Sequence, residues 1–107
     1  MSGEGEGVRL RVAIVTWRSR DLVERCLRSL FAHTRVEGME VVVVDNASGD
    51  GTVELLRERF PQVRVVANDA NLGFTRATNQ AMAGAGTAPV LLLNPDTELH
   101  GTSSGPA

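Results

Sequence analysis

The sequence predicts an α/β fold of the Rossmann-like, doubly wound type, built on a mostly parallel sheet. Four consecutive valines at residues 41–44 are apolar without alternation, as in strands that are buried on both faces of a parallel sheet. This run stops at Asp45 and passes through a dense turn signal, residues 46–51, into a helical pattern. Apolar runs and amphipathic stretches then alternate along the chain in the order β-α-β-α-β-α-β.

The first strand is expected at residues 10–16, which are rich in valine and isoleucine. A helix is expected from Asp21 onward, because apolar residues recur there at helical spacing. They form one stripe, made of Leu22, Val23, Cys26, Leu27, Leu30 and Phe31. The valine strand follows, at residues 40–45.

A second amphipathic helix is expected at residues 51–60, where Pro61 stops it. Either Ser48 or Asp50 has the side chain needed to cap its start. A short third strand is expected at residues 63–67, and its charged residue favours a place near the edge of the sheet.

The third helix is expected from Phe74 to about Gly84, and its many alanines favour close packing against the sheet. The fourth strand is expected at residues 89–93. All connections are long enough for right-handed crossovers, so the predicted spatial order of the strands is 3-2-1-4. The order along the sheet then reverses between the first and fourth strands, which is where open α/β sheets bind ligands.

The domain is expected to span residues 9–99. Residues 1–8 and 100–107 are of low complexity, and they predict a disordered leader and a disordered tail. Nothing after the fourth strand reads as a further strand, so one of its edges would stay unpaired. We therefore expect this chain to form the N-terminal half of a larger domain. We also expect that the exposed edge of the fourth strand allows self-association.

Composition excludes several function classes. The net charge is −2 and no basic run occurs, which argues against nucleic acid as a partner. All basic residues are arginines, so neither a P-loop lysine nor a Schiff-base lysine is available. The two histidines lack a metal-ligand spacing, and the single cysteine is expected to pack in the core. No membrane-spanning run or signal-peptide core is seen, so a cytoplasmic setting is expected.

Three polar residues lie at the ends of apolar runs or shortly after them: Thr16, Asp45 and Asp96. In a parallel sheet the carboxyl ends of the strands meet at one edge, so these side chains are expected to line one crevice. A carboxylate such as Asp45 can accept hydrogen bonds from a nucleobase or ribose, and its alternative role is to form a turn. Asp96 can coordinate a divalent ion, and its alternative is an ordinary Pro-Asp turn.

Two further side chains have both a binding and a structural interpretation. Arg76 lies on the third helix three residues before Asn79, so the two share a face that could reach a phosphate or ribose. The alternative for Arg76 is that its side chain is only solvated and contacts no ligand. Trp17, the only tryptophan, can stack on a base or pack at the sheet edge, and packing is slightly favoured.

Four segments together resemble a known family. They are VAIVTW at residues 12–17, VVVVDNASGDGT at 41–52, NLGF at 71–74 and LLLNPDTEL at 91–99. In this order and spacing they resemble the N-terminal, nucleotide-binding half of family-2 glycosyltransferases with the GT-A fold. The similarity covers residues 10–99 and is greatest to the rhamnosyltransferase-like branch, whose members make surface polysaccharides.

The resemblance implies an inverting transfer of a sugar from a UDP- or dTDP-sugar to a glycan or lipid-linked acceptor. It implies that Thr16 and Asp45 contact the base and ribose, with Trp17, Asn46 and Arg76 also beside the nucleotide. It also implies a location in the cytoplasm, at the inner face of the membrane.

The same resemblance places Asp96 at the metal-binding position of the Asp-x-Asp motif, which reads Asn94-Pro95-Asp96 here. A divalent ion, Mn²⁺ or Mg²⁺, is therefore expected. The catalytic base of the family lies beyond this motif, so no catalytic residue is assigned. The alternative is a non-catalytic or vestigial module that binds a nucleotide.

Overall fold

The computed structural model describes residues 9–34 and 37–95. The predicted leader and tail, and with them Asp96, lie outside the described residues. The elements follow the predicted order: β1 (Leu10–Thr16), α2 (Arg20–His33), β2 (Met39–Asp45), α3 (Thr52–Arg59), β3 (Arg64–Ala67), α4 (Phe74–Met82) and β4 (Val90–Leu93). The bounds agree with the prediction or differ by one residue, except at one end. The largest difference is at α4, which ends at Met82 because the next residue, Ala83, has an extended backbone (φ −64°, ψ 136°).

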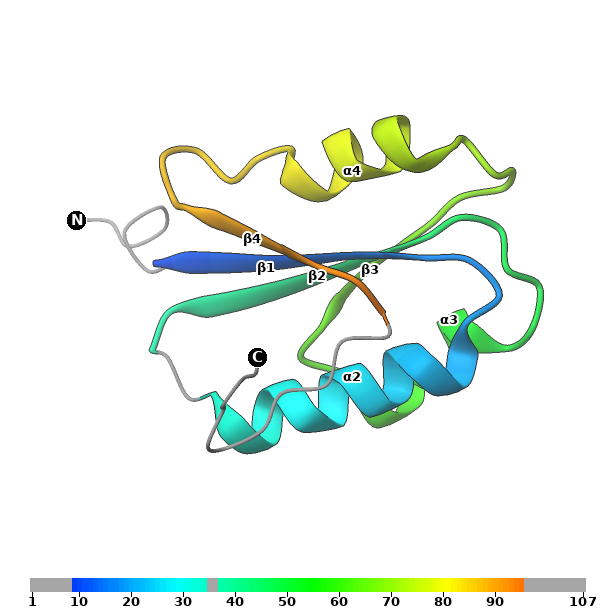
Figure 1. Ribbon diagram of the computed structural model, residues 1–107, viewed down its shortest axis with the longest axis horizontal. Helices are drawn as coiled ribbons and strands as arrows, with labels where there is room; N and C mark the ends of the chain where they lie inside the picture. The colour runs from blue at the N-terminus through cyan, green and yellow to red at the C-terminus, as the bar shows by residue number, and fades with distance from the viewer. Residues whose placement is uncertain (1–8, 35–36, 96–107) are drawn as a thin grey trace, which may run out of the picture.

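All strand pairs are parallel, and the sheet has the order β3-β2-β1-β4, which confirms the prediction. The register places Thr16 of β1 opposite Asp45 of β2, and Asp45 opposite Ala67 of β3. Helices α2 and α3 cover one face of the sheet and α4 covers the other (Figure 1). The short strand β3 lies at one edge, as its charge predicted.

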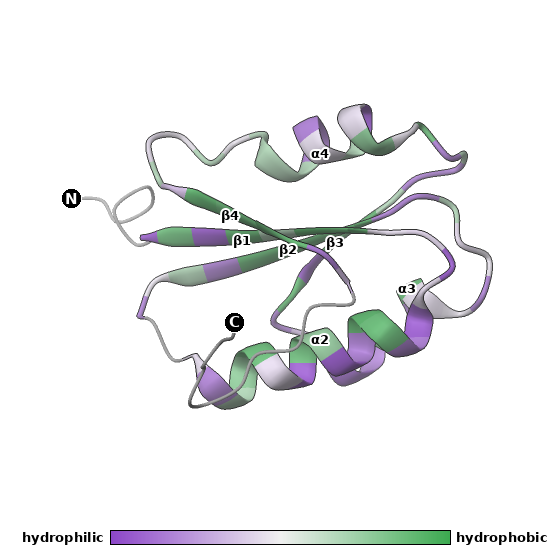
Figure 2. Ribbon diagram, in the orientation of Figure 1, coloured by the Kyte–Doolittle hydropathy of each residue, from purple (hydrophilic) through white to green (hydrophobic). Residues whose placement is uncertain are grey.

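The core has two layers because side chains alternate across a strand. Val41 and Val43 face α2 and α3, whereas Val42 and Val44 face α4. All four valines are buried, which explains why the run shows no alternation. In Figure 2 the hydrophobic colour follows the strands between the two helical layers. The layer under α2 also contains Cys26, which confirms its predicted place in the core.

The two helical layers differ in thickness. Leu27, Leu30 and Leu56 fill the layer between the sheet and the pair α2–α3. The buried residues of α4 itself are Ala77 and Ala81, so small side chains let this helix approach the sheet. Leu22, which was expected on the core stripe of α2, is instead exposed in the first turn of that helix.

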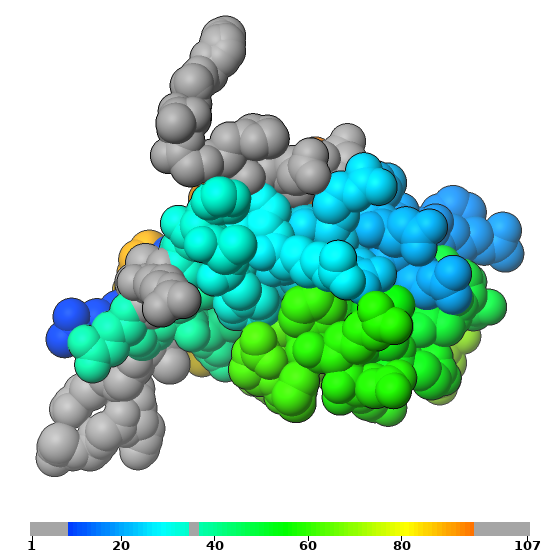
Figure 3. All heavy atoms as spheres, turned by 90° about the horizontal axis from the view of Figure 1, so that it is seen from below, coloured from blue at the N-terminus to red at the C-terminus, as the bar shows by residue number. Residues whose placement is uncertain are grey.

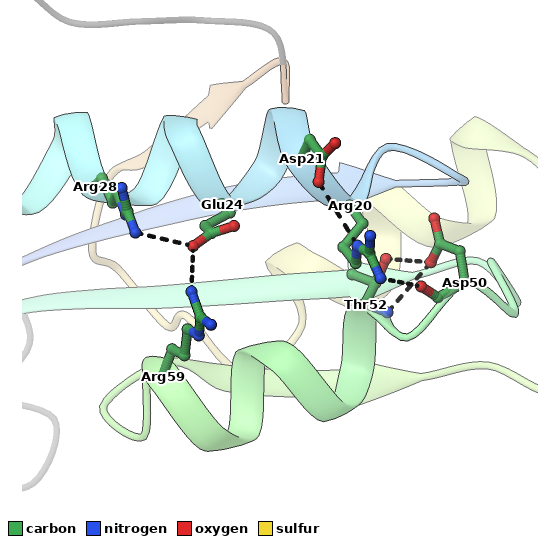
Figure 4. Close-up of polar contacts among 7 residues, drawn as sticks. All are labelled: Arg20, Asp21, Glu24, Arg28, Asp50, Thr52 and Arg59. Carbon is green, nitrogen blue, oxygen red and sulfur yellow. Dashed lines mark hydrogen bonds and ion pairs between the residues drawn. The ribbon is translucent and has the colours of Figure 1, made fainter.

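Helices α2 and α3 lie side by side on the lower face (Figure 3), and Glu24 joins them. Its carboxylate contacts Arg28 of the same helix at 3.2 Å and Arg59 of α3 at 2.9 Å (Figure 4). Both arginines are exposed, so solvent screens these pairs and each contributes at most about 1 kcal/mol. The helices are therefore held together by their apolar residues.

Arg11 of β1 is a charged residue inside the protein, with only 3% of its surface exposed. Its Nε and Nη2 atoms each lie 3.0 Å from Oε1 of Glu40 on β2. Its Nη1 atom donates to the carbonyl oxygens of Ala81, at 3.0 Å, and Ala83, at 2.6 Å. The last carbonyls of a helix have no intrahelical donor, so Arg11 caps the C-terminal end of α4.

Strand β4 pairs with β1, and its other edge has no partner strand among residues 9–34 and 37–95. Leu91 and Leu92 point to opposite faces of the strand and are both exposed. Self-association through this edge stays a prediction. Within the described part of the chain, no helix has both the length and the apolar character required to cross a membrane.

Candidate functional site

The candidate site lies at the carboxyl edge of the sheet, where β1 and β2 end side by side. Thr16 and Asp45 are paired in register, and the N–H of Asn46 donates to the carbonyl oxygen of Thr16 at 2.9 Å. The hydroxyl of Thr16 is buried and has no hydrogen-bond partner. A buried hydroxyl left unpaired costs free energy, so this atom has unused capacity to bind a ligand group.

Asp45 forms a turn with Ser48. Its Oδ1 accepts the Ser48 hydroxyl at 2.6 Å, and its Oδ2 accepts the Ser48 backbone N–H at 3.1 Å. The Ser48 hydroxyl in turn accepts the N–H of Arg18 at 2.7 Å, which joins the loops after β1 and β2. The turn-forming alternative for Asp45 is therefore realised in this structure, and contact with a nucleotide stays a prediction.

Asp50, and not Ser48, supplies the side chain at the start of α3. Its Oδ1 accepts the backbone N–H of Thr52 at 3.2 Å and also the Thr52 hydroxyl. Gly51 between them has φ 87°, a left-handed conformation that glycine adopts without strain. The backbone carbonyl of Asp50 also accepts Nη1 of Arg20 at 3.1 Å, which ties this turn to the start of α2 (Figure 4).

Burial raises the pKa of Asp50, but the hydrogen bonds from the Thr52 hydroxyl and N–H outweigh it, and the pKa lies below its ordinary value. A carboxylate with a lowered pKa in the folded state stabilises the fold above the pKa of the unfolded chain, about 4. That stabilisation is lost as the pH falls through the folded pKa.

We therefore expect Asp50→Asn to flatten the acid side of the stability profile. Asparagine keeps an oxygen for the Thr52 N–H but cannot ionise, so the melting temperature of the variant should fall less between pH 5 and pH 2.5, on either side of about pH 4. Glu58→Gln, on the exposed side of α3, is the control. Parallel profiles for wild type and Asp50→Asn would contradict the assignment.

A pocket of about 310 Å³ opens between the loop after β1 and the loop after β2. Its lining residues are Arg18, Ser19, Arg20, Asp21, Leu22 and Asp50. Trp17 precedes the lining residue Arg18 in the chain and has 47% of its surface exposed, and the guanidinium of Arg18 sits 5.0 Å from the ring centroid. Packing at the sheet edge thus accounts for only part of the surface of Trp17.

Asn46 is buried and faces inward. Its Oδ1 accepts Nδ2 of Asn68 at 3.1 Å and the backbone N–H of Leu72 at 3.2 Å, and its Nδ2 donates to the Gly73 carbonyl at 3.3 Å. Asn68 also pairs with Gln80 of α4. Sequence reasoning missed Asn68 and Gln80. The only signal was the density of amide side chains between β3 and α4.

The structure brings Thr16, Trp17, Asp45 and Asn46 to one edge of the sheet. Arg76 is exposed in the first turn of α4 and makes no ion pair among the residues described. No group of three or more His, Cys, Asp or Glu side chains that could hold a metal occurs within residues 9–34 and 37–95. The predicted metal ligand, Asp96, falls outside these ranges.

Comparisons with known proteins add a family assignment to this geometry. Residues 11–103 match the family model described as glycosyl transferase family 2. The chain is 35% identical over 100 residues to the N-acetylglucosaminyl-diphospho-decaprenol L-rhamnosyltransferase of Mycobacterium tuberculosis. This match covers 83% of the chain and 32% of the relative, so the chain spans about a third of the length of the curated relative.

Two solved structures are similar in fold and sequence. The mannosyltransferase PcManGT from Pyrobaculum calidifontis, in complex with GDP-Man and Mn²⁺, superposes with a TM-score of 0.72 and 30% identity, over 82% of this chain and 27% of that one. A fragment of TarS from S. aureus in complex with UDP superposes with a TM-score of 0.73 and 26% identity, over 83% of this chain and 28% of that one.

Proposed function

Because the chain belongs to glycosyl transferase family 2, we propose that it binds the donor in an inverting transfer of a sugar from a UDP- or dTDP-sugar. The observation that carries this proposal is the juxtaposition of Thr16, Asp45 and Asn46 at the carboxyl edge of a parallel sheet. Ligands of open α/β sheets bind at this edge, next to the point where the strand order reverses.

The unpaired hydroxyl of Thr16 is proposed to bond a carbonyl group of the base. The carboxylate of Asp45, next to it in register, is proposed to accept from the base imide or from a ribose hydroxyl. Since both oxygens of Asp45 are bonded to Ser48 in the free chain, this contact would share or replace one of those bonds. Arg76 is proposed to approach the diphosphate from α4.

A divalent ion, Mn²⁺ or Mg²⁺, is proposed to be held by Asp96 together with the diphosphate oxygens of the donor. Its chemistry would be to neutralise the charge that develops on the departing nucleoside diphosphate. Support comes from the mannosyltransferase neighbour, which is in complex with GDP-Man and Mn²⁺. Among residues 9–34 and 37–95, no group of three or more His, Cys, Asp or Glu side chains could hold such an ion.

The acceptor is proposed to be lipid-linked, in the synthesis of a surface polysaccharide at the inner face of the membrane. The support is the name of the mycobacterial relative, which identifies a diphospho-decaprenol substrate. No described residue is assigned as the general base. The complete reaction is proposed for a protein of the relatives' length, of which this chain spans about a third.

Calorimetric titration with UDP, dTDP, GDP and ADP, each with and without Mn²⁺, tests the donor-binding role. We expect binding that prefers the pyrimidine nucleotides and becomes tighter with Mn²⁺. Excess EDTA added to the Mn²⁺ titration is the control, and it should return the affinity to the metal-free value. The absence of binding to all four nucleotides would contradict the proposal and favour a vestigial module.

A further inference from the structure

The apolar contact of helix α4 with the sheet is made by small side chains. Its buried side chains are two alanines, Ala77 and Ala81, whereas Phe74 at its start is 61% exposed. Small side chains allow close approach, but they leave few interlocking contacts that would oppose sliding. Polar contacts to the last turn of the helix and to the turn that precedes it therefore contribute to its position.

At its C-terminal end, α4 is held by Arg11, which donates to the Ala81 and Ala83 carbonyls. In the same last turn, Gln80 is held by a pair of amides. Nδ2 of Asn68 donates to Oε1 of Gln80 at 2.8 Å, and Nε2 of Gln80 donates back to Oδ1 of Asn68 at 3.0 Å. This reciprocal pair joins α4 to the end of β3.

The pair continues through Asn46 to the turn that precedes α4. Oδ1 of Asn46 accepts both Asn68 Nδ2 and the Leu72 N–H, while Nδ2 of Asn46 donates to the Gly73 carbonyl. This set of bonds specifies the orientation of the Asn46 amide, because the flipped amide would place its NH₂ group against two donors. Asn46 is thus hydrogen-bonded to the turn at two backbone groups, the N–H of Leu72 and the carbonyl of Gly73.

We propose that Asn68 and Gln80 are positioning residues, which act through Asn46 to hold the turn at residues 71–73 in its binding conformation. This inference rests on the proposed function and deepens it. Neither residue contacts the nucleotide. They keep Asn46 from turning outward and keep the turn, three residues ahead of Arg76, at the carboxyl edge of the sheet.

The physical reason is pre-organisation. Gly73 has φ 85° and ψ 165°, a conformation for which a free glycine has no strong preference. Without the Asn46 bonds the turn would sample other conformations, and the ligand would have to select the competent fraction. The apparent dissociation constant rises in inverse proportion to that fraction.

The test is Gln80→Leu, which removes both bonds of the amide pair and keeps a good helix former. If the competent fraction falls to about a fifth, the dissociation constant for UDP in the presence of Mn²⁺ rises about fivefold. Hydrogen exchange of the Leu72 N–H, measured without nucleotide, should become faster in the same variant. Gln62→Leu, the same substitution at an exposed position outside the cluster, should change neither quantity.

Two further variants separate positioning from a general loss of stability. Val63→Ala removes buried apolar surface next to α3 and should lower the melting temperature without changing UDP affinity or Leu72 exchange at 10 °C. Gln80→Glu keeps the side-chain shape and the acceptor for Asn68 but lacks the donor. Its affinity for UDP should lie between those of wild type and Gln80→Leu. If Gln80→Leu does not fold, Gln80→Glu takes its place in the test.

If wild type binds UDP and Gln80→Leu binds it equally well, the inference is overturned and the proposed function stands. Weaker binding with unchanged exchange at Leu72 would also overturn it, because the effect would not pass through the turn. If wild type binds none of the nucleotides, the proposed function fails. The positioning role in binding then fails with it, whatever the exchange at Leu72 shows.

Discussion

Replacing Glu40 with leucine is expected to lower the free energy of unfolding by about 3 kcal/mol, as is typical when one partner of a buried ion pair is removed. Arg11 would stay buried with its charge uncompensated, and only the two carbonyl acceptors on α4 would remain. Glu40 is 28% exposed, so the loss should fall at the lower end of the range for buried pairs.

Urea unfolding followed by circular dichroism measures this change. Glu58→Leu, at an exposed position on α3, is the matched control and should change stability by less than about 0.5 kcal/mol. The double variant Arg11→Met, Glu40→Leu should recover only part of the loss, because two apolar side chains can replace a buried pair but the Ala81 and Ala83 carbonyls lose their donor. Equal effects of Glu40→Leu and Glu58→Leu would show that Arg11 does not depend on Glu40.

Replacing Asp45 with alanine is expected to weaken nucleoside diphosphate binding at least tenfold, which corresponds to about 1.4 kcal/mol. The change removes a carboxylate that is proposed to contact base or ribose, and it also releases the turn that Ser48 closes. Titration with UDP and dTDP in the presence of Mn²⁺ measures the effect. An unchanged affinity would remove Asp45 from the binding site.

Two milder variants separate the contributions of Asp45. Ser48→Ala removes the hydroxyl bond but keeps the backbone N–H and the carboxylate, so most of the affinity should remain. Asp45→Asn keeps an oxygen for the turn but loses the charge and one acceptor. If Ser48→Ala weakens binding as much as Asp45→Ala, the carboxylate acts only through the turn.

The positions of the strands could be predicted because their signals are local or follow general rules of connection. The valine run at 41–44 identified a strand buried on both faces, and its four side chains do alternate between the two layers. Right-handed crossovers then led to the order 3-2-1-4, which the sheet has. The placement of Thr16 beside Asp45 followed from that order, since both residues end neighbouring parallel strands.

The hydrogen-bond partners of the polar side chains could not be predicted in the same way. Asp50 and Ser48 are equally good caps by residue type, and the fold decided between them by placing Ser48 against Asp45 and Arg18. Arg11 reads as an ordinary charged residue at the start of a strand. It is buried because β2 and the end of α4 converge on it with acceptors.

The sequence by itself therefore determined the fold class, the strand order and the edge at which the site lies. Hydrophobic periodicity and connection lengths depend only on residues that are close together in the sequence. Only the tertiary structure decided how the amides of Asn46, Asn68 and Gln80 are used. These residues are separated by 22 and 12 positions, and they meet because β2, β3 and α4 pack together. Hydrogen bonds over such separations depend on the register of packed elements, which no local pattern records.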